Sequence, residues 1–104
     1  MTAALVSSGE AAVARGDLDA AVTAFRAAVF VDPEQPTIHF QLGRALEACG
    51  DGRGARRAYA AALAALDRCD PGAVEACLGG WLVRELAGVL RAKLDQPATG
   101  RREP

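Results

Sequence analysis

The chain has 104 residues, enough for one small domain with a single core and too few for a second. Apolar residues make up 51% of it but aromatic residues only 5%, so Ala, Leu and Val must supply most of the core, which favours closely packed helices. A formal net charge of −1 without a polybasic run gives no support for a nucleic-acid or membrane partner. No apolar run could cross a bilayer and the N-terminus lacks a signal-peptide pattern, so we expect a cytoplasmic protein.

The first predicted unit covers about residues 2–35 and contains the stretch GDLDAAVTAF, which begins at Gly16. We expect Gly16 to end one helix in the left-handed conformation and Asp17 to cap the next. Because the connection is short, the two helices must lie antiparallel. The stretch VDPEQP then stops the second helix, since proline cannot continue the helical hydrogen-bond ladder.

A second unit, about residues 36–69, repeats this pattern with GDGRGARRAY, 34 residues further on. In this register small residues recur at sites of close helix approach, and an aromatic residue recurs between the helices. The aligned pairs are Gly9 with Gly43, Ala21 with Ala55, and Phe25 with Tyr59. The second unit runs on as AALAALDRCDP, which predicts a longer second helix.

Residues from about 71 to 95 do not form a third full repeat. From Trp81 onward, apolar residues recur at helical spacing, which predicts an amphipathic helix. A stacked array exposes an apolar face at each end, so we expect this helix to cap the second repeat. Residues 1–95 would then form a single domain, followed by a disordered tail at 96–104.

The segments FQLGRALEACGDGRGARRAYAAAL and SSGEAAVARGDLDAAVTAFRAAVFVDP resemble the tetratricopeptide repeat (TPR) family, with Ser8 in place of the usual Leu. The resemblance implies an all-α fold: two antiparallel helix-turn-helix repeats plus a C-terminal capping helix, a fragment of a right-handed α-solenoid. The ending also resembles helical segments behind CheR-type chemotaxis methyltransferases, which suggests a signalling setting. A methyltransferase domain itself would need a strand-rich unit and a glycine loop that are missing here.

No residues predict catalysis, a cofactor or a metal site. His39 is the sole histidine and falls at a large, inter-helix position of the repeat, which favours a structural role. The three cysteines are odd in number and lack Cys-x-x-Cys spacing, so we interpret Cys49, Cys69 and Cys77 as small buried residues. We therefore expect a protein that is not an enzyme.

Binding of another protein is the favoured function. In TPR arrays the first helix of each pair lines a concave groove. The resemblance implies groove positions at Val6, Glu10, Val13, Phe40, Arg44 and Glu47. Phe40 beside Arg44 would offer an apolar contact and a charged hydrogen bond, unless Val6 or the capping helix covers it. The mixed charges suit a peptide or helix that carries a basic residue and an apolar anchor, and Glu10 would repel an acidic chain end.

Self-association is the alternative. Two repeats and a cap are fewer than a stable stack usually needs, so a second copy could complete it. Leu5 at one end and Trp81 at the other would then carry a two-fold interface.

Overall fold

The computed structural model describes residues 2–68 and 83–95 as helices joined by short turns, with no strand among them. This confirms the all-α, TPR-like helical repeat architecture. The helices are α1 (Thr2–Arg15), α2 (Leu18–Val31), α3 (Pro36–Ala48), α4 (Gly52–Arg68) and α6 (Val83–Asp95).

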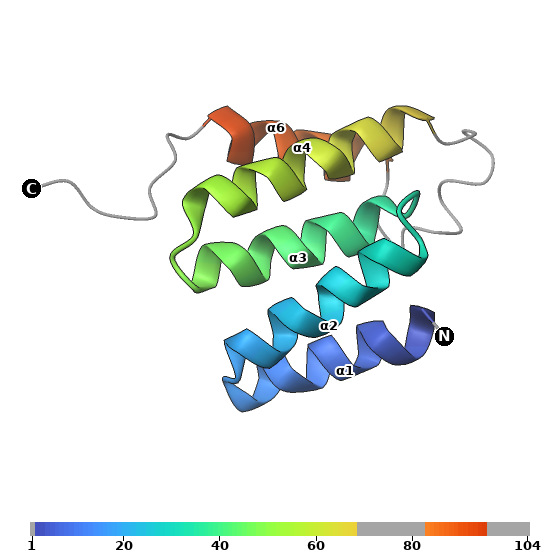
Figure 1. The fold of residues 1–104 in the computed structure, drawn as a ribbon. Helices are drawn as coiled ribbons and strands as arrows, with labels where there is room; N and C mark the ends of the chain where they lie inside the picture. The colour runs from blue at the N-terminus through green and yellow to red at the C-terminus, as the bar shows by residue number, and fades with distance from the viewer. Residues whose placement is uncertain (1, 69–82, 96–104) are drawn as a thin grey trace, which may run out of the picture.

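The first four helices lie in chain order across the molecule, each antiparallel to the one before (Figure 1). The most extensive contacts join α1 to α2 and α3 to α4, the two hairpins that the repeat predicts. Helix α2 packs on α3 to join the hairpins, and α4 packs on α6. The buried residues form one cluster that runs through all of these helices.

Both turns have the predicted chemistry. Gly16 and Gly50 adopt positive φ angles of 80° and 89°, a backbone conformation that glycine enters without the steric cost a side chain brings. The Asp17 side chain accepts the backbone N–H of the third residue of α2 at 3.2 Å. Asp51 does the same for the third residue of α4 at 2.9 Å. Each carboxylate thus satisfies a helix N–H that has no partner within its helix.

The aligned glycines allow an aromatic ring to lie against the first helix of each hairpin. A Cβ atom added at Gly9 would lie 2.6 Å from Phe25 Cε1, and one added at Gly43 would lie 2.5 Å from Tyr59 Cε1. Both rings are almost fully buried. The predicted pairing of a small residue with an aromatic one is therefore confirmed in both repeats.

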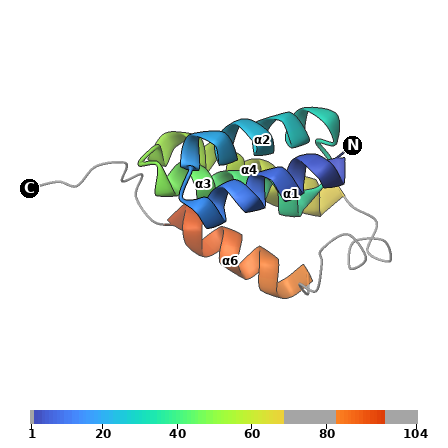
Figure 2. The same ribbon diagram turned by 90° about the horizontal axis from the view of Figure 1, so that it is seen from below.

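Helix α6 closes the second repeat, as expected of a cap. Leu86 and Leu90 are fully buried and belong to the same cluster as Tyr59. Arg56 Nη1 on α4 also donates a hydrogen bond to the Leu94 carbonyl at 2.7 Å, satisfying an oxygen near the end of α6. Figure 2 shows α6 on the opposite side of the molecule from α2. The cap thus covers the side of the second repeat that faces away from α2.

The second helix of repeat two is longer than its counterpart, since α4 has 17 residues and α2 has 14. The predictions for Trp81, for the remainder of 69–82 and for the tail at 96–104 fall outside the described residues.

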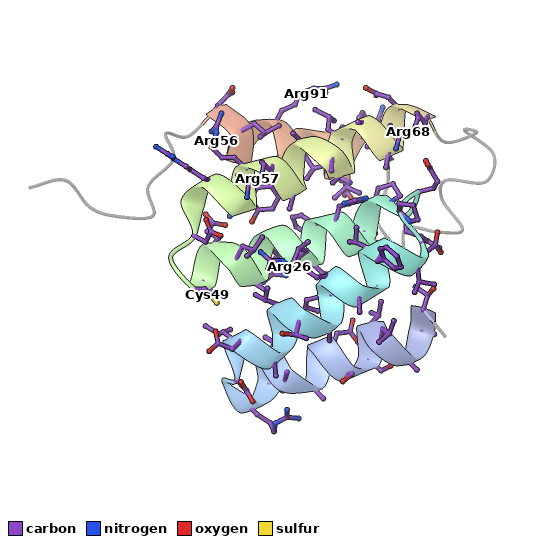
Figure 3. All side chains as sticks on the ribbon, in the orientation of Figure 1. Arg26, Cys49, Arg56, Arg57, Arg68 and Arg91 are labelled. Carbon is purple, nitrogen blue, oxygen red and sulfur yellow. The ribbon has the colours of Figure 1, made fainter. Side chains whose placement is uncertain are left out.

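The sequence predicts structural roles for His39 and Cys49, and only His39 has one. His39 is 8% exposed, and its Nε2 donates to the Pro33 carbonyl at 2.7 Å, which holds the loop before α3 against the helix. Cys49 is exposed, so the expectation of a buried residue is wrong (Figure 3). It follows the last residue of α3, where the chain turns away from the core. Cys69 and Cys77 lie outside the described residues.

Candidate functional site

A groove of about 350 Å³ opens between α1 and α3, with α2 beneath it. Its lining includes three of the six predicted groove residues: Glu10, Val13 and Arg44. Glu10 and Val13 are three residues apart on α1, so their side chains leave the same face of the helix. Val13 is 45% exposed, so part of this apolar side chain is accessible to a partner.

The rest of the groove is formed by residues that the sequence interpretation did not assign to it. Small residues at one-turn spacing give α3 a shallow wall, and two apolar residues of α2 form the floor. They are Gln41, Ala45 and Ala48 on α3, and Leu18 and Phe25 on α2. The α3 residues could have been found from helical spacing, because they lie three or four positions from Arg44 or from each other.

The two charges of the groove come from opposite walls. Glu10 on α1 accepts a hydrogen bond from Gln41 Nε2 across the groove at 2.9 Å. Arg44 on α3 is exposed, and its guanidinium carbon lies 5.8 Å from the centre of the Phe40 ring. This is a cation–π geometry that holds the side chain over the ring. The α1 wall therefore combines the Glu10 carboxylate with an apolar strip at Val13, and it faces the positive charge of Arg44 on the α3 wall.

Phe40 does not reach the surface, which corrects its placement as an accessible groove anchor. It is only 6% exposed, and its ring centre lies 6.0 Å from that of Tyr59. It belongs to the buried cluster that includes Leu90 of α6 and against which Val6 packs. The structure agrees with the alternative interpretation, in which neighbouring parts of the chain cover Phe40. Phe40 supports Arg44 from below and is not itself available to a partner.

Glu47 is also used within the chain. Its Oε1 accepts hydrogen bonds from Tyr59 Oη at 2.7 Å and from Lys93 Nζ at 3.0 Å, so one carboxylate joins α3, α4 and α6. Partial burial would raise the pKa of Glu47, but the hydrogen bonds and the charges of Lys93 and Arg44 outweigh it and lower the pKa. Burial and the Glu47 carboxylate together raise the pKa of Tyr59 well above 10.0. Glu47 does not line the α1–α3 groove.

Val6 and Leu5 are both half-buried on α1. Val6 packs against the core cluster and is absent from the groove lining, so it does not join Glu10 and Val13 there. The groove is thus shorter than the sequence predicts and sits between the two repeats, on the stretch of α1 from Glu10 to Val13.

The groove is equipped for recognition. It offers one carboxylate, one guanidinium, one amide and an apolar strip, the groups that hold a peptide by charge and shape. Within residues 2–68 and 83–95, no group of three or more His, Cys, Asp or Glu is placed to hold a metal ion. None of the helices described in that part of the chain is long and apolar enough to span a membrane.

Comparison with known proteins supports the repeat assignment. Residues 9–50 match a family model described as TPR repeat, a stretch that contains α2, α3 and the end of α1. The match supports the TPR family for this part of the chain, and such repeats are in general protein–protein interaction modules, typically without catalytic activity. No curated protein matches the chain, and neither does any solved structure.

Proposed function

We propose that the chain is a non-catalytic adaptor that binds a segment of another protein in the α1–α3 groove. The observation that carries the proposal is the exposed Val13 beside Glu10 on the α1 wall, opposite Arg44, in a groove of about 350 Å³. A protein segment has the right chemistry, because one apolar side chain can cover Val13 while polar groups beside it meet the two walls.

The order of charges across the groove restricts the partner segment. Glu10 requires a basic residue on the α1 side, and Arg44 accepts an acidic residue or a backbone carbonyl on the α3 side. The Gln41 amide already donates to Glu10, so an incoming Lys or Arg would join an existing hydrogen bond. We therefore propose a segment with a basic residue and an apolar anchor. A cytoplasmic location and a bacterial signalling setting, suggested by the CheR-type resemblance, belong to the same proposal.

Affinity capture from the native cell extract tests the groove with a paired variant and a matched control. Val13→Asp/Arg44→Glu places a charge on the strip and reverses the positive wall, so we expect retention of the partner to fall at least about tenfold. Arg91→Glu is the control, because Arg91 is exposed on α6 and does not line the groove. Circular dichroism confirms that each variant keeps its helices. A partner retained equally by the groove variant and the wild type would contradict the proposal.

Self-association is the second candidate, favoured by one observation. Phe30 on α2 is 88% exposed and is followed by Val31, which is 43% exposed, so two large apolar side chains meet solvent at the end of one helix. Neither was among the residues predicted for self-association: Leu5 is half-buried, and Trp81 lies outside the described residues. In the capture experiment, a tagged chain that retains only untagged copies of itself would replace the adaptor proposal with self-assembly.

A further inference from the structure

A second hollow lies between α2 and α4, away from the proposed groove. It has a volume of about 250 Å³, and α3 contributes its floor. Two arginines form opposite rims, Arg26 on α2 and Arg57 on α4. Figure 3 shows both on the same face of the molecule, on either side of α3. Between them lies an apolar floor formed by Leu42, Leu46, Ala58 and Ala61.

The two guanidinium groups are available for a ligand. Both arginines are exposed, and neither has a hydrogen bond or ion pair within the described residues. This separates them from Arg56, which donates to the Leu94 carbonyl, and from Arg68, which pairs with Glu34 at 3.1 Å. A guanidinium presents a planar fork of donors that matches a carboxylate, so two of them across a hollow favour carboxylate ligands.

No acidic side chain lines the hollow to neutralise them. Asp51 lies beside Gly54 at the edge of the hollow, and its Oδ1 accepts the Gly54 N–H at 2.9 Å. His39 also lines the hollow, but its Nε2 is committed to the Pro33 carbonyl. The hollow therefore carries an uncompensated positive charge on a chain whose net charge is −1.

We propose that this hollow docks an acidic segment of a partner protein, whose carboxylates pair with Arg26 and Arg57 above the apolar floor. The volume is smaller than the roughly 300–1,000 Å³ of sites that hold whole small molecules, and it suits one or two side chains. A nucleic acid would need a longer basic stripe, and inorganic phosphate, which a guanidinium also binds, serves as a comparison ligand in the test. The charge preference is opposite to that of Glu10 in the groove, so this site goes beyond the proposed function.

The position of the two sites on α3 keeps them apart. The groove uses Gln41, Arg44 and Ala45, whereas the hollow uses Leu42 and Leu46. At about 100° per residue, these two sets point roughly 130° apart around the helix. An acidic segment in the hollow therefore leaves the groove open.

Nuclear magnetic resonance titration with blocked peptides provides the test. The probe is acetyl-Glu-Leu-Leu-Glu-amide, and the comparison ligands are acetyl-Lys-Leu-Leu-Lys-amide and inorganic phosphate. We expect saturable shifts of the Leu42 and Leu46 methyl signals and of the Arg26 and Arg57 Nε signals with the acidic peptide only. Absence of shifts at these positions, or equal shifts with phosphate alone, would overturn the proposal.

Variants separate docking in the hollow from general charge attraction. Arg26→Gln/Arg57→Gln should weaken binding of the acidic peptide at least about tenfold, because it removes both charge-assisted contacts. Arg91→Gln/Arg15→Gln removes the same charge from α6 and α1 and should leave binding unchanged. An equal loss in both pairs would overturn the proposal. The Val13 methyl signals report the groove separately in the same titration, so failure of the groove proposal and failure of this one remain distinguishable.

Discussion

At the residue scale, each hairpin depends on a glycine that faces an aromatic ring. Gly43 lies in the middle of α3, where glycine costs about 0.5–1 kcal/mol relative to alanine in helix stability. The fold accepts this cost because a Cβ atom there would come within 2.5 Å of the Tyr59 ring. Tyr59 is 2% exposed and has no space to retreat. The glycine is therefore required by packing between helices and not by the backbone of its own helix.

Replacing this glycine tests the argument, because a second helical glycine offers a matched control. Gly43→Ala should destabilise the fold by about 1–3 kcal/mol through overpacking against Tyr59. Gly88→Ala on α6 should stabilise it by about 0.5–1 kcal/mol, since a Cβ there meets nothing within 4 Å. Urea unfolding followed by circular dichroism measures both. Equal stability of Gly43→Ala and the wild type would show that the ring contact does not limit this position.

The bond between Glu47 and Tyr59 links stability to pH at both ends of the scale. The pKa of Glu47 is lowered from 4.5, so its contribution is complete above that value and is lost as pH falls through the folded pKa. The pKa of Tyr59 is raised above 10.0, so its contribution is complete below that value and is lost as pH rises. The pair therefore stabilises the fold most across the neutral range.

Tyr59 is the sole tyrosine of the chain, so tyrosinate absorbance reports its titration alone. We expect the native protein to titrate above pH 10.0, and Glu47→Ala to lower that midpoint because it removes both the hydrogen bond and the negative charge. Burial persists in this variant, so the midpoint should not fall below 10.0. Glu10→Ala is the control and should leave it unchanged. An unchanged midpoint in Glu47→Ala would show that the carboxylate does not act on the phenol.

At the element scale, α6 is part of the core and not an appendage. Its Leu86 and Leu90 are fully buried. Two polar contacts also stabilise the end of the helix: Arg56 donates to the Leu94 carbonyl, and Lys93 pairs with Glu47. Without α6, the apolar face that α4 and Phe40 share would meet water. Capping an array in this way removes an aggregation-prone surface as well as adding stability.

Truncation of one buried leucine measures what the cap contributes. Leu90→Ala should cost about 2–5 kcal/mol, because it removes buried methyl groups and leaves a cavity. Arg91→Ala, one residue further along the same helix but exposed, should change stability by no more than about 0.5 kcal/mol. Thermal unfolding of both should remain a single transition. If α6 instead unfolded in a separate transition at lower temperature, α6 would not be an integral part of the core.

At the scale of the whole molecule, the sequence predicts the structural features that depend on contacts within a single hairpin. The turn glycines, the aspartate caps and the glycine–aromatic pairs all occur within one hairpin and are written twice, 34 residues apart. Repetition allows such local contacts to be predicted from the sequence, because the same physical requirement selects the same residue types at both places. The all-α architecture was accessible in this way, whereas the cap was predicted from the apolar face that the end of a stacked array exposes.

Contacts that α6 makes with the repeats could not be predicted in the same way. Phe40 and Glu47 occupy positions that would face a groove in an uninterrupted array, but here Phe40 is buried and Glu47 binds Lys93, a residue 46 positions away. That contact has no counterpart in the first repeat, so the periodicity carries no signal for it. Glu10, Val13 and Arg44 do line the groove between α1 and α3, to which α6 contributes no residue, and their role in binding a partner stays a prediction.

The arrangement in which each helix packs mainly on its neighbours in chain order also bears on how the chain reaches this structure. Contacts between residues close in sequence require little loop closure, and helical proteins of this kind fold on the order of microseconds to milliseconds. Folding can begin in either hairpin and spread to the other through α2 and α3. Because the groove needs only α1 to α3, it can form without the cap, whichever hairpin folds first.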